Sequence, residues 1–375
     1  MRFLTLVLVL LTAHLVAHAA PRKATRKTHP ARPQAKPLSP DKLRGQIAYV
    51  QNADLWVIDP DTLRKHLLFS HDVTTRITPR APGLTYLASD FALSPDLKSL
   101  IVNVRPSVWQ VEPLSENDRR NARQGGSVLY VFTFDGKPAR ALTSDDYQTK
   151  NNPRWSPDGK HIAYNQVGYN NYVPDTESAQ EVHIVDVDGS HGHRVAGTIE
   201  ADGSPDGYFA SDVFWSLDSK RVMFTLSPSG TQTVPDSPQT LTAALDGSNR
   251  QPFDGNWSDF DLPDVARDAR LRARPANRVE GGTGCVNLLQ FDPAASKADV
   301  VATFLEETEG FSLSAPICPD ATARRIVFQG RVFSATVNAQ GGVKTSSSLS
   351  GIFLSVKGSG KVRLLVANAT LVGWL

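Results

Sequence analysis

A short turn motif recurs along the chain and constrains the fold more than any other feature. Its clearest copy, residues 155–160, reads WSPDGK, and an apolar strand follows it. Pro157 presets the backbone for the second position of a tight turn, Asp158 can accept hydrogen bonds from nearby backbone N–H groups, and Gly159 tolerates the exit geometry. One copy predicts a hairpin, whereas several copies at a regular spacing predict a repeat architecture.

The motif occurs six times, and its aspartates lie 46 to 62 residues apart. This spacing suits a four-stranded antiparallel sheet with its turns. A mostly apolar strand follows each clear copy, as expected of a strand covered on both faces. Further along each unit a second strand pair surrounds another turn, as in VHIVDVDGSHGHRV at 182–195. The motif aspartates are Asp41, Asp96, Asp158, Asp218, Asp264 and Asp320.

These units predict an all-β fold, a six-bladed β-propeller of four-stranded antiparallel blades. Radial stacking around an axis covers both faces of small sheets and leaves only short edges. The chain finishes with an inner-strand pattern at 369–375 and no turn after it, whereas residues 38–50 supply a turn and a second strand without a first. We therefore expect the C-terminal strand to join the N-terminal blade, with Trp374 in the place of Trp155 and Trp215.

The repeats also resemble a known family. WSPDGKHIAY followed by VHIVDVDGS is similar to the unit of TolB-like, WD-repeat-like propellers, found in periplasmic TolB proteins and in prolyl-oligopeptidase-like peptidases. The resemblance covers residues 39–375 and implies the same six-bladed fold, which serves both as scaffold and as enzyme. TolB proteins carry an α/β domain before the propeller, and the peptidases carry a hydrolase domain with a G-x-S-x-G motif. In this chain only a short tether precedes the repeats and that motif is absent, so no catalytic residues are expected.

The first forty residues predict export. Residues 1–19 combine Arg2, an apolar run and small residues before a cleavage site after Ala19, which is typical of a secretory signal peptide. Residues 20–38 are rich in bases and prolines and contain no acid, which predicts an extended basic linker. Residues 39–375 are then the propeller, periplasmic or secreted. No further apolar stretch is long enough to span a bilayer, so we expect no membrane-spanning segment.

The charge of the chain and its cysteines indicate which classes of partner and which covalent links to expect. Residues 41–375 hold 33 Lys and Arg against 38 Asp and Glu, so the body is mildly acidic and nucleic-acid binding is not expected. Cys285 and Cys318 are the two cysteines, and they either form a disulfide or remain two buried thiols. No metal or other cofactor is expected because no ligand set is indicated. We expect a monomer.

The connections differ in length between the two ends of the strands. Turns after the first and third strand of each unit are short, whereas the connections after the second and fourth strands are long. A strand order that runs outward from the axis places the long connections on one face, where binding surfaces usually form. We call it the long-connection face and predict that it recognises a ligand. The long connections are 70–90, 105–127, 166–180, 197–211, 227–239 and 331–348.

Aromatic side chains of the long-connection face are candidate binding residues. Rings with a polar tip anchor protein partners or stack on sugars. Taken singly, the same rings can instead pin their own loops to the blades. The candidates are Trp109, Tyr169, Tyr172, Tyr208 and Trp257.

The fifth unit departs from the repeat pattern. It has acids where other units have Trp, and arginines where the second strand is expected to be apolar. We expect a hairpin register in which these charges pair directly across the strands. They can then grip a charged ligand group in the channel wall, or form an internal salt-bridge ladder. The expected pairs are Asp261 with Arg270 and Asp259 with Arg272.

The predicted function is that of an exported, non-enzymatic propeller. It binds an envelope or secreted protein partner through the long-connection face. The alternative is a carbohydrate-active propeller, a lyase or a glycan-binding protein that uses the channel mouth, because other TolB-like propellers are used in this way.

Overall fold

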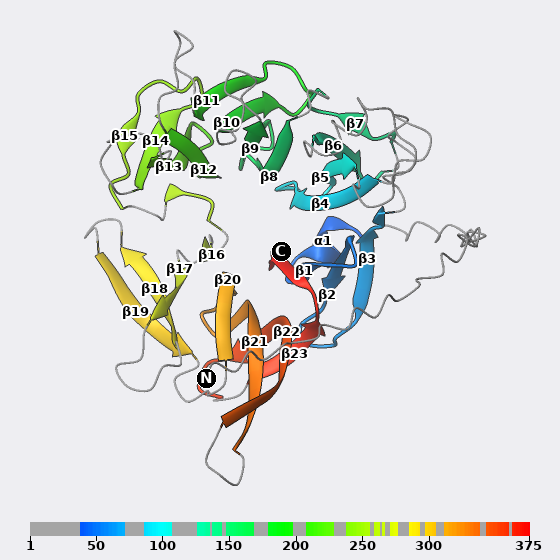
Figure 1. The fold of residues 1–375 in the computed structure, drawn as a ribbon, viewed down its shortest axis with the longest axis vertical. Coiled ribbons are helices and arrows are strands. Elements are labelled where there is room, and N and C mark those ends of the chain that lie inside the picture. Colours follow the sequence, from blue (N-terminus) through cyan, green and yellow to red (C-terminus); the bar gives the residue numbers. More distant parts are fainter. Residues whose placement is uncertain are drawn as a thin grey trace, which may run out of the picture. The chain divides into compact units, whose positions relative to one another are not determined.

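The computed structural model is built almost entirely of β-strands. Its described residues contain one short helix, α1 (Pro40–Leu43), and 24 strands, which form six four-stranded antiparallel sheets (Figure 1). The predicted six-bladed propeller is thereby confirmed. The predicted signal peptide and residues 20–37 of the predicted linker lie outside the described residues. The structure describes residues 38–71, 86–106, 126–135, 137–144, 148–168, 179–197, 208–228, 238–255, 259–262, 265–266, 271–276, 285–292, 297–304, 311–337, 343–359 and 362–375.

The sheets follow one another along the chain as blades one to six, and the strands of each blade run outward from an inner strand. From the inner strand outward, blade one contains β24 (Thr370–Trp374), β1 (Ile47–Gln51), β2 (Asp54–Ile58) and β3 (Lys65–Phe69). Blade two contains β4 (Tyr86–Leu93), β5 (Ser99–Pro106), β6 (Val128–Thr133) and β7 (Arg140–Ala141). Blade three contains β8 (Thr149–Trp155), β9 (His161–Gly168), β10 (Ala179–Asp186) and β11 (His193–Gly197).

The second half of the chain repeats this arrangement. Blade four contains β12 (Tyr208–Trp215), β13 (Arg221–Pro228), β14 (Gln239–Ala244) and β15 (Gln251–Pro252). Blade five contains β16 (Val265–Ala266), β17 (Leu271–Ala276), β18 (Cys285–Asp292) and β19 (Lys297–Phe304). Blade six contains β20 (Phe311–Pro319), β21 (Arg325–Val337), β22 (Val343–Val356) and β23 (Val362–Ala367).

The last strand of the chain closes the ring. β24 pairs antiparallel with β1, and Trp374 lies opposite Ile47. The backbone of Leu375 exchanges two further hydrogen bonds with the segment before β1. Trp155 and Trp215 hold the same register position in blades three and four, at the end of the inner strand. The predicted closure, with Trp374 as their counterpart, is confirmed.

Three copies of the turn motif share one hydrogen-bond pattern. In blade three, Ser156 Oγ donates to Asp158 Oδ1 over 2.6 Å and accepts from the backbone N–H of His161 at 2.9 Å. Ser94 and Ser216 make the same pair of bonds in blades two and four. The serine hydroxyl therefore joins the two ends of the turn. In blades two and four its hydrogen bond is the main cause that lowers the pKa of the motif aspartate.

Replacing Ser156 with alanine is expected to reduce the free energy of unfolding by about 1–2 kcal/mol, because a part-buried backbone N–H loses its acceptor. Ser156 is fully buried, so water has poor access to the vacated position. Urea unfolding of S156A measures the effect. Ser248→Ala, at an exposed turn, is the matched control and should change stability by less than about 0.5 kcal/mol. Equal effects for the two variants would contradict this role of the hydroxyl.

Two motif copies differ from the prediction. Asp41 lies in α1 rather than in a tight turn, because no inner strand precedes it in the chain to form a hairpin. In blade six, Asp320 takes the place of the serine rather than of the motif aspartate. Its Oδ1 accepts from the backbone N–H of Arg325 at 3.0 Å, which is the role that Ser156 has in blade three. Asp264 lies outside the described residues.

The hydrophobic core lies between neighbouring blades, and indole groups reinforce the same junctions. Core clusters join blades three and four, one and six, five and six, one and two, and two and three. Trp155 Nε1 donates to the carbonyl of Ala92 in blade two over 2.9 Å. Trp215 Nε1 donates to the carbonyl of Arg154 in blade three over 3.0 Å. The inner strands are thus held to one another by side chains as well as by ring closure.

Candidate functional site

The short turns of neighbouring blades are bonded to one another. The backbone N–H of Asp158 donates to Ser219 Oγ at 3.0 Å, between blades three and four. Arg325 Nη1 lies 3.1 Å from Asp61 Oδ1, between blades six and one. Further hydrogen bonds from side chains to carbonyl groups join blade two to three and blade three to four. Several polar groups at this short-turn face are therefore engaged in contacts between blades.

The long connections leave from the opposite ends of the strands. In blade three, His161 pairs with Asp186 beside the short turns, whereas Gly168 pairs with Ala179 at the other end, where the connection 169–178 begins and ends. Most of the residues in these connections lie outside the described residues, and the same holds for the side chain of Tyr208, which begins β12. The binding role of the aromatic set stays a prediction. The candidates outside the described residues are Trp109, Tyr169, Tyr172 and Trp257.

One predicted connection is largely a strand extension. The sequence predicts a loop over 331–348, but β21 and β22 stay paired from Arg325 and Val356 as far as Val337 and Val343. The reason lies in the composition of these segments, since Val, Phe and Thr favour extended strands even between polar residues. Among the described residues, β21 and β22 therefore form the longest paired hairpin.

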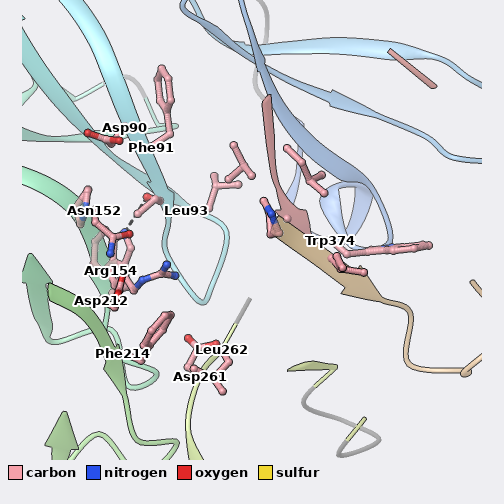
Figure 2. Close-up of a pocket in the computed structure, with 18 of the residues that line it drawn as sticks. Asp90, Phe91, Leu93, Asn152, Arg154, Asp212, Phe214, Asp261, Leu262 and Trp374 are labelled. Atoms are coloured by element: carbon pink, nitrogen blue, oxygen red, sulfur yellow. Dashed lines mark hydrogen bonds between the residues drawn. The ribbon is translucent and has the colours of Figure 1, made fainter. Parts of the chain in front are cut away.

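The inner strands surround a central channel. Its cavity has a volume of about 1130 Å³ and is lined by residues of all six blades. Figure 2 shows part of this lining, with labelled residues of blades one to four and of the segment before β16. Apolar side chains form much of the wall, and charged groups of both signs interrupt it. The charged lining residues are Asp90, Asp212, Asp261, Arg154, Arg272 and Arg274.

β-Bulges place polar side chains in this channel. β4, β8 and β12 each show a register shift against the second strand of their blade, as happens where an extra residue bends a strand. Asp90, Asn152 and Asp212 lie within these shifts and line the channel (Figure 2). Asn152 and Asp212 have φ values of 53° and 54°, in the left-handed region that Asn and Asp adopt more readily than most residues.

These three residues are not among those predicted from the sequence, although a signal for them exists. Each lies six positions before the motif aspartate of its blade. A polar residue at one fixed offset in three successive inner strands indicates a common structural position. Comparing the repeats position by position would therefore have found them.

The predicted hairpin register of blade five is wrong. Arg272 lies opposite Val265 in the pairing of β16 with β17, and not opposite Asp259. Two backbone hydrogen bonds of 2.7 Å instead join Asp259 and Asp261 to the end of β12 and the residue two positions beyond it in blade four. The observed register of β16 and β17 therefore differs from the predicted one, and the segment before β16 is bonded to blade four. Asp261 and Arg272 nevertheless both line the channel, Asp259 is exposed, and Arg270 lies outside the described residues.

Arg154 has an unusual environment in the channel wall (Figure 2). Its guanidinium carbon lies 4.6 Å from the centre of the Phe214 ring, which is a cation–π contact. Its Nε is buried and has no hydrogen-bond partner among the described residues. Burial lowers the pKa of the Arg154 guanidinium, and the carboxylates of Asp261 and Asp212 counteract this shift. Arginine stays protonated in proteins, so the wall holds a partly desolvated positive charge.

Tyr49 and Cys318 lie in the hydrophobic core rather than in the channel. Burial raises the pKa of Tyr49 to about 12, and this side chain lies in the core between blades one and six. Cys318 is buried in that core, whereas the side chain of Cys285 lies outside the described residues.

Within the described ranges, no three His, Cys, Asp or Glu side chains are placed to hold a metal ion. No helix in those ranges is long and apolar enough to cross a membrane.

Comparisons with known proteins found similar solved structures but no matching sequence family. No protein-family model and no curated protein match the chain. Among solved structures, an oligogalacturonate lyase from Vibrio parahaemolyticus is 13% identical over 86% of this chain and 77% of that chain, with a TM-score of 0.46. TolB from Acinetobacter baumannii is 16% identical over 88% of this chain and 67% of that chain, with a TM-score of 0.41. The β-propeller domain of the Trilobed protease from Pyrococcus furiosus is 9% identical over 76% and 97%, with a TM-score of 0.37. TolB is thus among the solved structures to which the chain is similar, and similarity at this level assigns neither a family nor a function to the chain.

Proposed function

We propose that this chain is an exported, non-enzymatic β-propeller that binds a protein partner of the cell envelope through its long-connection face. The observation that carries the proposal is the difference between the two faces. Short turns at one face are bonded to one another across blades, whereas the long connections begin at the opposite strand ends. Long connections on a rigid scaffold can vary in shape without disturbing the core, which suits recognition.

The side chains of the channel wall indicate which groups a partner could contact there. Arginine and aromatic side chains in partly desolvated positions dominate the energetics of many protein interfaces. Arg154 and Phe214 provide such a pair in the channel. The carboxylates of Asp90 and Asp212 line the same channel. A segment of a partner that enters the channel would therefore meet both charged and apolar groups.

The test uses the chain, purified after expression of the full sequence, as bait for an envelope extract. Two variants shorten the long connections by replacing 108–124 or 169–178 with a Gly-Ser linker. The matched control is Lys160→Glu with Lys220→Glu, because both lysines are exposed beside short turns. We expect the shortened variants to lose a partner that the control retains. Retention by the shortened variants, or loss in the control alone, would contradict the proposal.

Among the described residues, nothing favours the carbohydrate-active alternative over protein binding. A panel of polysaccharides, read by thermal shift with and without a chelator, provides the matching comparison. We expect no change in melting temperature with any polysaccharide. A shift that the chelator removes would favour the alternative.

A further inference from the structure

We infer that Arg154 anchors a carboxylate group of an extended peptide segment inside the central channel. The inference rests on the proposed function, since the segment belongs to the protein partner. It assigns a specific residue and a ligand chemistry to the channel.

Arg154 is the charged member of an otherwise apolar set of equivalent positions. It lies two residues before the serine of its turn motif. The same position is Ala92 in blade two and Phe214 in blade four, and both line the channel. An aliphatic residue at Arg154 would continue this wall without placing a charge in it. Among the described residues the Arg154 guanidinium contacts the Phe214 ring but forms no ion pair, and an anionic ligand group would supply one.

The guanidinium is held in place before any ligand arrives. The carbonyl of Arg154 accepts the indole N–H of Trp215 at 3.0 Å, which fixes the backbone at this point of β8. The Phe214 ring, 4.6 Å away, supports the guanidinium. Among the described residues, Arg154 forms no ion pair, and its Nε donates to none of them. The guanidinium group is planar, and its N–H groups can donate two parallel hydrogen bonds to the two oxygens of a carboxylate.

The neighbouring acids favour a peptide over a simple anion. The carboxylates of Asp261 and Asp212 raise the pKa of the Arg154 guanidinium, but neither forms an ion pair with it. A small anion at Arg154 would face these carboxylates with no donor to offer them. An extended peptide carries backbone N–H groups on either side of its carboxylate, and these can donate to Asp212. The cavity, at about 1130 Å³, exceeds the range of about 300–1,000 Å³ typical of small-molecule pockets, so a segment of several residues fits.

The test follows the Nε–H resonance of Arg154 by NMR in the chain labelled with ¹⁵N-arginine. Its disappearance in Arg154→Lys assigns it. Two probes carry a carboxylate, acetyl-Ala-Ala-Asp-amide in its side chain and acetyl-Ala-Ala-Ala at its free C-terminus, so they separate the two sources of the group. Acetyl-Ala-Ala-Asn-amide and inorganic phosphate are the controls. We expect at least one carboxylate peptide to shift the resonance and both controls to leave it unchanged. An equal shift with the neutral peptide, or a shift with phosphate alone, overturns the inference.

Affinity for the shifting peptide provides the second measurement. Arg154→Gln should weaken it at least tenfold, and Arg154→Lys should weaken it several-fold because the ammonium group lacks the planar fork. Lys160→Gln, which removes an exposed charge at the short-turn face, should leave it unchanged. Arg154→Gln should also fold with an unchanged or higher melting temperature, since the lost charge has no ion-pair partner among the described residues. Unchanged peptide affinity in Arg154→Gln overturns the inference.

Partner capture separates this inference from the proposed function. If the shortened connections lose the partner but Arg154→Gln binds it with full affinity, the proposed function stands and the inference fails. If a carboxylate peptide binds at Arg154 while no partner depends on the long connections, the proposed function fails and the carboxylate site stands.

Discussion

Deletion of residues 370–375 is expected to abolish the cooperative unfolding of the propeller. These residues form β24, the inner strand of blade one, and their loss leaves the edge of β1 unpaired. Leu371 is buried in the core between blades one and six, and Trp374 packs against it. Fully burying a side chain such as Leu371 stabilises a protein by about 1.5–3 kcal/mol, and the half-buried Trp374 adds to this. Loss of both side chains and of the pairing between β24 and β1 is large beside the stability of a typical domain, about 5–15 kcal/mol.

Near-UV circular dichroism and calorimetry of the truncated chain measure this effect. A synthetic peptide of residues 369–375, added in excess, should restore part of the near-UV signal because it can pair with β1. A scrambled peptide of the same composition should not restore it. A truncated chain that unfolds with the wild-type midpoint would contradict ring closure by β24.

Trp215→Ala is expected to lower the free energy of unfolding by about 3–5 kcal/mol, as large-to-small changes at buried aromatic residues do. Trp215 is fully buried, in the core shared by blades three and four. The His161 ring stacks near it, with centroids 6.1 Å apart, and its indole N–H is bonded to the Arg154 carbonyl. The variant therefore leaves a cavity at a blade junction and frees the backbone that carries Arg154.

Trp215→Phe is the matched control for this variant. It keeps most of the apolar contact but removes the indole N–H, so we expect a loss of about 1–2 kcal/mol. Guanidinium unfolding, monitored by far-UV circular dichroism, compares the three proteins. A loss below about 1 kcal/mol for W215A would contradict the view that the blade junctions carry the stability of the ring.

The sequence predicts the fold well because each blade repeats a local signal. The turn serine and aspartate bond to backbone groups within five residues of themselves, so their geometry follows from local chemistry. Ring closure is equally visible, since Trp374 follows an inner-strand pattern in the same way as Trp155 and Trp215. The extension of β21 and β22 beyond the blade is less visible, because Ser and Thr occur in both loops and strands.

The candidate site is harder to predict because it depends on contacts between blades. The residues of blade five favour cross-strand pairing of Asp259 and Asp261 within that blade, but backbone hydrogen bonds tie this segment to blade four. Arg154 directly precedes the clearest motif of the chain, and its only sequence signal is a charge where the equivalent positions hold Ala92 and Phe214. Its character comes from Phe214 of the next blade and from burial in the channel. Neither can be read from spacing along one repeat.

A protein partner that binds at the long-connection face and reaches the channel should slow amide exchange at both places. Hydrogen–deuterium exchange of the chain, with and without its captured partner, measures this effect. We predict slower exchange in 107–125, in 169–178 and in the channel-lining segment 152–155. Protection confined to the short turns, such as 94–99 and 156–161, would contradict the claim.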